Sequence, residues 1–188
     1  GVCVLDPASG RFSIRRLPSG IGGIQPLVFA LVRDRQGMMW AGTTMGLFRI
    51  DPATRTVTEI SRVFEDRPGL VRIESLALDG DGALWAGTSW SDLYRIVTAT
   101  GRITHFPVGN SGSLRGSEGF WDIEPRNDGY LWIASDRGLF QFNPTDSTLR
   151  SIGAGAGAPS GPVFAIVTDS AGTLWLSTGD GIYRYPRP

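Results

Sequence analysis

Short apolar runs separated by polar turns recur along the whole chain. Four apolar runs are rich in residues that favour β-strands, and turn residues bound each of them. They span residues 28–34, 74–79, 120–126 and 163–169. A glycine-containing turn follows each run, then a segment with a tryptophan, then a third short segment with an apolar pair. No stretch of about twelve residues combines helical spacing with helix caps. The pattern predicts an all-β chain built from hairpins.

These segments form an internal repeat. Trp40, Trp85, Trp132 and Trp175 stand 45, 47 and 43 residues apart. A glycine lies three residues before each tryptophan, and an aspartate lies six residues before all but the third, where Arg126 takes its place. Four strands in a repeat of about 45 residues are typical of a β-propeller blade. The regular tryptophans are expected to pack between neighbouring blades rather than to form a stacking platform.

The repeats indicate one propeller segment over residues 1–188, with about four blades of four antiparallel strands. Residues 1–17 match the second half of a repeat, and residues 163–186 supply the first three strands of another. A closed four-bladed ring would need RFSIRR, residues 11–16, as the outer strand of the last blade, and it would leave GVCVLD unused. The pattern therefore favours an arc of a larger propeller.

Composition and charge exclude several classes of function. Eighteen basic and eighteen acidic residues give a formal net charge of zero, so no nucleic-acid or anionic membrane surface is indicated. No apolar run approaches the roughly 18 residues that a membrane span needs. The single cysteine, Cys3, excludes an internal disulfide and a cysteine-based metal cluster. The DGDG stretch, 79–82, favours a hairpin turn over a calcium loop, because its twelfth position is Trp90. No metal or cofactor is expected.

The stretches DRQGMMWAGTTMGLFRIDPAT and DSAGTLWLSTGDGIYRY resemble the two-component regulator propeller repeat. The resemblance implies an extracytoplasmic, periplasmic sensor region of a bacterial membrane-anchored receptor, followed by an immunoglobulin-like domain, a membrane helix and a kinase or cyclase. It implies a small-molecule ligand, possibly a carbohydrate, and no catalysis. The implied partners are the remaining blades, the downstream signalling domains and a second receptor copy.

Two other functions stay open. A propeller face can dock another protein, so the segment can also be an interaction scaffold. Similar repeats occur in streptogramin lyase, a propeller enzyme that uses a histidine and a bound magnesium ion. The only histidine here, His105, falls in RITHFPV, which is expected to be an outer strand far from the axis. Without an inward-facing histidine, that chemistry lacks an evident general base.

The second repeat breaks the pattern after its tryptophan strand. It reads TSWSDLYRI, with an extra residue and with Asp92 where the other copies have glycine. A surface-facing Trp90 beside the Asp92 carboxylate would suit a sugar or an aromatic ligand. Alternatively, Trp90 covers an adjacent blade and Asp92 caps a turn. Arg67, Arg72 and Arg115 could together receive an anionic ligand. The face that carries this turn is expected to present Arg67, Arg72, Arg115, Glu118, Trp121, Asp136, Arg137 and Asp180.

Overall fold

The computed structural model describes residues 1–18, 23, 25–60, 71–108, 119–153 and 157–185. The described residues form antiparallel β-sheets in two compact units, Gly1–Ile73 and Glu74–Pro188. The described part of the chain has no helical segment with the length and hydrophobicity of a membrane span. The all-β prediction is confirmed.

The first unit contains a hairpin and a four-stranded meander. Strands β1 (Val2–Leu5) and β2 (Phe12–Arg15) pair with each other. The meander consists of β3 (Val28–Arg33), β4 (Met39–Thr43), β5 (Gly46–Ile50) and β6 (Val57–Glu59). The core of this unit joins both parts and is formed by Val2, Leu17, Ala41, Phe48 and Ile50. The partial repeat expected at residues 1–17 therefore contains the β1–β2 hairpin.

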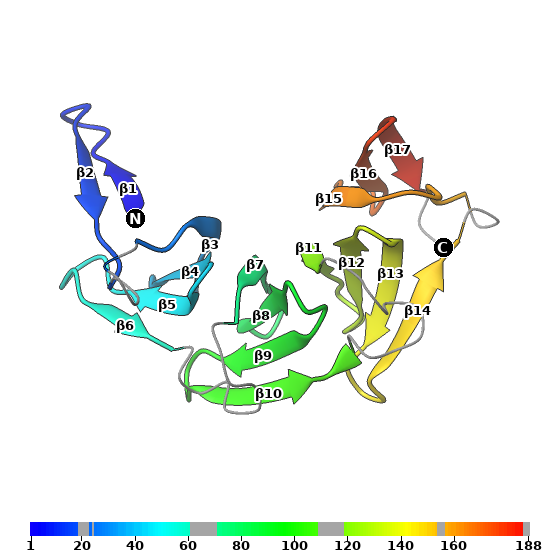
Figure 1. The fold of residues 1–188 in the computed structure, drawn as a ribbon, viewed down its shortest axis with the longest axis horizontal. Helices are drawn as coiled ribbons and strands as arrows, with labels where there is room; N and C mark the ends of the chain where they lie inside the picture. The colour runs from blue at the N-terminus through cyan, green and yellow to red at the C-terminus, as the bar shows by residue number, and fades with distance from the viewer. Residues whose placement is uncertain (19–22, 24, 61–70, 109–118, 154–156, 186–188) are drawn as a thin grey trace. The chain divides into compact units, whose positions relative to one another are not determined.

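The second unit contains the remaining repeats. One sheet consists of β7 (Ile73–Leu78), β8 (Ala83–Thr88), β9 (Leu93–Val97) and β10 (Arg102–Phe106). The next consists of β11 (Phe120–Pro125), β12 (Leu131–Ser135), β13 (Gly138–Asn143) and β14 (Thr148–Ile152). The last has β15 (Val163–Thr168), β16 (Leu174–Thr178) and β17 (Gly181–Tyr185). Figure 1 shows each set as a meander in which neighbours in the chain are neighbours in the sheet.

Two repeated tryptophans of the second unit, Trp85 and Trp132, pack between sheets, as predicted. Trp85 is 2% exposed and lies 5.5 Å from the Phe106 ring and 6.2 Å from the Phe142 ring of the next sheet. Trp132 is 3% exposed and belongs to a cluster with residues of β15, β16 and β17. Trp175, at the same position on β16, is 41% exposed.

Two side chains on the first strands join one sheet of this unit to the next. The Ser75 hydroxyl donates to the Phe120 carbonyl at 2.8 Å. Asp122, at the same repeat position one sheet later, accepts the backbone N–H of Ile166 at 2.8 Å and that of Ile123 at 2.9 Å. Strands β7, β11 and β15 are the first strands of meanders and each has an edge without a ladder partner in its own sheet. These side chains therefore bind polar backbone groups at edges that the ladders leave open.

Asp122→Ala is expected to lower the free energy of unfolding by about 1–2 kcal/mol, because two backbone donors lose their acceptor. Burial raises the pKa of Asp122 above its ordinary value of 3.8, against the lowering effect of the two N–H donors. Because the pKa of Asp122 is raised in the folded state, the stabilisation by its carboxyl group is complete below pH 3.8. This stabilisation is lost as the pH rises through the raised pKa. Urea unfolding of the native chain and of Asp122→Ala between pH 3 and 7 measures this effect. The difference between their free energies of unfolding should shrink as pH rises. A difference that grows with pH would contradict this assignment.

Candidate functional site

The aspartate of each Asp-x-x-Gly turn organises the residues around the repeated tryptophan. Asp79 Oδ1 accepts the backbone N–H groups of Asp81 and Ala83 at 3.0 and 2.9 Å. Its Oδ2 accepts the Trp85 indole N–H at 3.1 Å and Arg95 Nε and NH2 at 3.2 and 3.0 Å. Burial raises the pKa of Asp79, but these hydrogen bonds outweigh it and leave the pKa below its ordinary value. Asp79 is therefore a structural carboxylate whose oxygens are already occupied.

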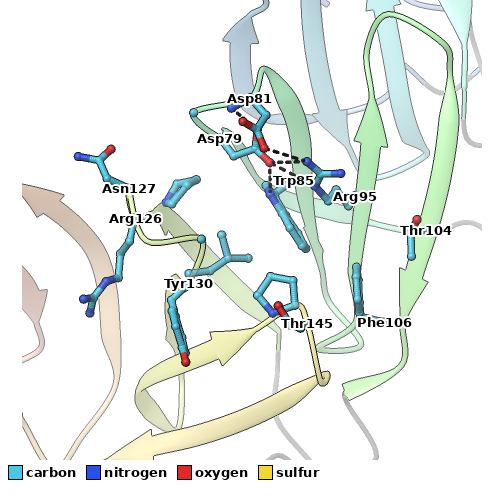
Figure 2. A pocket seen from close by; sticks show the side chains of 15 residues that line it. Asp79, Asp81, Trp85, Arg95, Thr104, Phe106, Arg126, Asn127, Tyr130 and Thr145 are labelled. Atoms are coloured by element: carbon cyan, nitrogen blue, oxygen red, sulfur yellow. Dashed lines mark hydrogen bonds and ion pairs between the residues drawn. The ribbon is translucent and has the colours of Figure 1, made fainter.

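A groove of about 510 Å³ lies beside this aspartate, between the β7–β10 and β11–β14 sheets (Figure 2). We call it the Trp85 groove. Trp85, Phe106 and Leu131 supply apolar walls, and Thr104, Asn127, Tyr130 and Thr145 supply polar groups. In Figure 2, Arg126 points away from Asp79 and Trp85. The groove opens where the β7–β8, β11–β12 and β13–β14 turns lie, at the opposite end of the sheets from the β8–β9 turn. The site residues predicted from the sequence are expected at the end of the sheets that carries the β8–β9 turn.

The β8–β9 turn explains why the second repeat carries no glycine there. In the other repeats Gly46, Gly138 and Gly181 adopt φ of 103°, 108° and 143°, where a side chain is strained. The extra residue in the second repeat moves the left-handed position to Ser91, with φ of 58°. Thr88 Oγ1 accepts the backbone N–H groups of Trp90 and Asp92. Asp92 can therefore keep a side chain at the start of β9.

The structure separates the roles expected for Trp90 and Asp92. Trp90 is 59% exposed, in agreement with the prediction of a surface aromatic. Asp92 is 1% exposed, so its expected surface position is wrong. The Asp92 Oδ2 atom lies 3.3 Å from His105 Nε2 on β10, and the His105 ring stacks on Tyr94 at 4.5 Å. His105 does lie on an edge strand, as expected, but its side chain is only 18% exposed. The aspartate thus holds the last two strands of this sheet together.

We expect Asp92→Asn and His105→Gln to be coupled. Each variant removes one member of a buried side-chain contact, so the double variant should lose about 1–2 kcal/mol less than the sum of the single losses. The measurement is a double-mutant cycle from urea denaturation at pH 6. A control cycle that pairs Asp92→Asn with Arg150→Gln, on the outer strand of the next sheet, should be additive. Additive losses for the Asp92 and His105 pair would show that the contact is energetically silent.

The other predicted site residues that the structure describes each contact near neighbours. Arg67, Arg115 and Glu118 lie outside the described residues. Arg72, in the first unit, places its guanidinium 4.4 Å from the Phe29 ring. Trp121 stacks on Phe164 at 5.2 Å. Asp136 and Arg137 lie in the β12–β13 turn with 3.4 Å between Oδ2 and Nε, and Asp180 accepts from Thr178 at 2.6 Å and from Tyr183 at 3.0 Å. Each described residue thus contacts near neighbours in its own repeat or an adjacent one.

Comparison with known proteins identifies the repeat. Residues 157–180 match the family model described as Two component regulator propeller, in agreement with the resemblance found in the sequence. No curated protein matches the chain by sequence.

Solved structures show the same fold. One is described as the extracellular domain of the one component system BT4673 from B. thetaiotaomicron, with a TM-score of 0.78 and 18% identity over 98% of this chain and 25% of that one. Another is that of the hybrid two component system BT3049 from the same organism, with a TM-score of 0.75 and 23% identity over 97% and 24%. The chain spans about a quarter of the length of each. A catalytically inactive virginiamycin B lyase from Staphylococcus aureus, with quinupristin, has a TM-score of 0.68 and 19% identity over 95% and 60%.

The repeats, the antiparallel meanders and these likenesses agree on one architecture. This chain is a segment of a β-propeller, and it carries the two-component regulator propeller repeat at residues 157–180.

Proposed function

We propose that this chain is a ligand-binding part of the extracellular sensor propeller of a bacterial two-component-type receptor. The match of residues 157–180 to the two-component regulator propeller model carries the proposal. The fold likeness to two domains described as extracellular parts of such systems supports it. The ligand is a small molecule, with a carbohydrate as the leading class. The segment functions in the periplasm, together with further blades and signalling domains of a membrane-anchored receptor, and it binds without catalysis.

The described residues are suited to binding rather than to bond cleavage. The Trp85 groove combines apolar walls with hydroxyl and amide groups, as small-molecule sites do. Its central carboxylate, Asp79, is held by hydrogen bonds from Trp85 and Arg95 and has a lowered pKa, so it is a poor general base. The histidine, His105, faces Asp92 within one sheet. These contacts favour a sensor over the lyase whose fold is similar.

The test is to measure binding and turnover together. The 188-residue chain is incubated with oligosaccharide fragments and with quinupristin, and thermal unfolding and the mass of each recovered compound are measured. A ligand at about 100 times its Kd stabilises a folded protein by about 2.7 kcal/mol, which is a readily measured rise in the unfolding midpoint. We expect at least one oligosaccharide to raise the midpoint and to be recovered unchanged. Linearised quinupristin, or any other converted compound, would contradict the proposal.

A further inference from the structure

The third repeat has the same backbone as the others around its tryptophan but different side chains. In the other repeats the indole N–H donates to the repeat aspartate, at 2.7 Å for Trp40, 3.1 Å for Trp85 and 3.0 Å for Trp175. Arg126 replaces that aspartate in the third repeat. The turn itself is unchanged, because Arg126 N donates to the Tyr130 carbonyl and Gly129 N donates to the Arg126 carbonyl, as in the other copies. Only the chemistry at the tryptophan differs.

This replacement leaves the Trp132 indole N–H without an acceptor in the described chain. Trp132 is 3% exposed, and no described residue accepts a hydrogen bond from its Nε1–H. The Arg126 guanidinium lies over the ring, with its carbon 5.1 Å from the centroid, and its Nε and NH2 donate to Asp128 at 3.0 and 2.6 Å. Arg126 is therefore held by Asp128 and offers the indole no acceptor. The Trp132 Nε1–H is therefore available to an acceptor from outside the described chain.

A free acceptor stands next to this donor. Glu124 is the direct cross-strand partner of Trp132, so both side chains lie on the same face of the sheet. The same position carries Val32 in the first repeat and Val167 in the last. No described residue donates to the Glu124 carboxylate. On the other side of Trp132 the repeat arginine is replaced by Gln141. The third repeat thus presents a carboxylate beside its tryptophan where the first and last repeats have valine.

Trp132 and Glu124 both line a groove of about 360 Å³ between the β11–β14 and β15–β17 sheets. We call it the Trp132 groove. Leu174 contributes an apolar wall, and Asp169 contributes a carboxylate. The Asp169 oxygens already accept hydrogen bonds from the Trp175 indole and from the backbone of Ala171 and Thr173. The groups left for a ligand are therefore the Trp132 donor and the Glu124 acceptor.

The charges in the groove select the ligand class. Glu124, Asp128 and Asp169 outnumber the single cation, Arg126, so an anionic ligand is repelled. The indole N–H needs an acceptor and the carboxylate needs a donor, so a ligand group that binds both must carry one of each. A secondary amide holds an acceptor and a donor on adjacent atoms of one planar group.

We propose that the Trp132 groove binds the secondary amide of a ligand. The amide carbonyl accepts the Trp132 Nε1–H, and the amide N–H donates to the Glu124 carboxylate. An N-acylated sugar and a peptide both offer this group. The inference rests on the ligand-binding part of the proposed function, and it is tested by binding alone, so a failure of signalling would not affect it.

The experiment follows the Trp132 indole resonance of the ¹⁵N-labelled 188-residue chain, assigned by its loss in Trp132→Phe. The chain is titrated separately with N-acetylglucosamine, N-acetylglycine N-methylamide and glucose. We expect a saturable shift of this resonance with an amide and none with glucose. A shift with the sugar amide alone identifies an N-acylated sugar, and a shift with the peptide amide alone identifies a peptide. The proposal is overturned if neither amide shifts the resonance or if glucose shifts it equally.

Three variants make the assignment specific. Arg126→Asp restores the repeat carboxylate, which should accept the indole N–H within the chain and abolish the amide-dependent shift. Its turn would then read DNDG, close to the DGDG of the second repeat. Glu124→Gln should weaken binding about tenfold, because it replaces a charged acceptor. Trp40→Phe is the matched control, since its indole is bound to Asp34 in the first unit, and it should leave the Trp132 shift unchanged. An undiminished shift in Arg126→Asp would overturn the proposal.

Discussion

Replacing Trp85 with alanine is expected to lower the free energy of unfolding of the Glu74–Pro188 unit by about 3–5 kcal/mol, the cost typical of removing a buried aromatic side chain. Trp85 is 2% exposed and contacts Phe106 in its own sheet and Phe142 in the next. Its removal would leave a cavity at the joint between the two sheets. Urea denaturation followed by circular dichroism measures the loss.

The repeat supplies a matched control for this substitution. Trp175 occupies the same repeat position and keeps the indole bond to its aspartate, but it is 41% exposed. Trp175→Ala should therefore cost less than half as much. Equal losses for the two variants would contradict this explanation. They would show that the indole hydrogen bond, rather than packing between sheets, sets the contribution of the repeated tryptophan to the free energy of unfolding.

Gly119→Ala is expected to destabilise the same unit by about 2–5 kcal/mol, from the combined costs of backbone strain and overpacking. Gly119 has φ of 130°, and an added Cβ would lie 2.8 Å from Ser89 Cα and 2.9 Å from the Thr88 carbonyl oxygen. Both neighbours are backbone atoms of the preceding sheet, so no side-chain rotation relieves the contact.

Gly129→Ala separates the two costs. Gly129 also has a positive φ, 87°, but nothing lies within 4 Å of an added Cβ. Its substitution should cost about 1 kcal/mol, as for alanine in a left-handed turn position. Thermal unfolding of both variants measures the two losses. If Gly129→Ala were as destabilising as Gly119→Ala, the packing explanation would be wrong.

The fold could be predicted because its causes are local and repeated. Each Asp-x-x-Gly turn uses a carboxylate to accept nearby backbone N–H groups, and each tryptophan follows at a fixed offset. Such contacts span only a few residues, so they recur as a motif in the sequence. The strand boundaries and the burial of Trp85 and Trp132 follow from the same pattern.

The site could be predicted only in part, because the contacts that form it join distant residues. Asp92 was recognised as a departure from the repeat, but its burial depends on His105, thirteen positions later on another strand. The Asp122 bond to Ile166 spans 44 residues. Arg126 was also visible as a departure. Its consequence for Trp132 became apparent only when the strand register placed Glu124 and Gln141 on either side of that indole.

In this chain, residues that follow the repeat build the fold, whereas the departures in the third repeat leave polar groups for a ligand. The variant Glu124→Val, Arg126→Asp, Gln141→Arg restores the repeat at that place, and its thermal unfolding with and without N-acetylglucosamine and N-acetylglycine N-methylamide tests this division directly. We predict an unfolding midpoint at or above that of the native chain and no response to either amide. A midpoint about 3 °C lower, the equivalent of about 1 kcal/mol for a chain of this size, would contradict it by showing that the three native residues serve the fold.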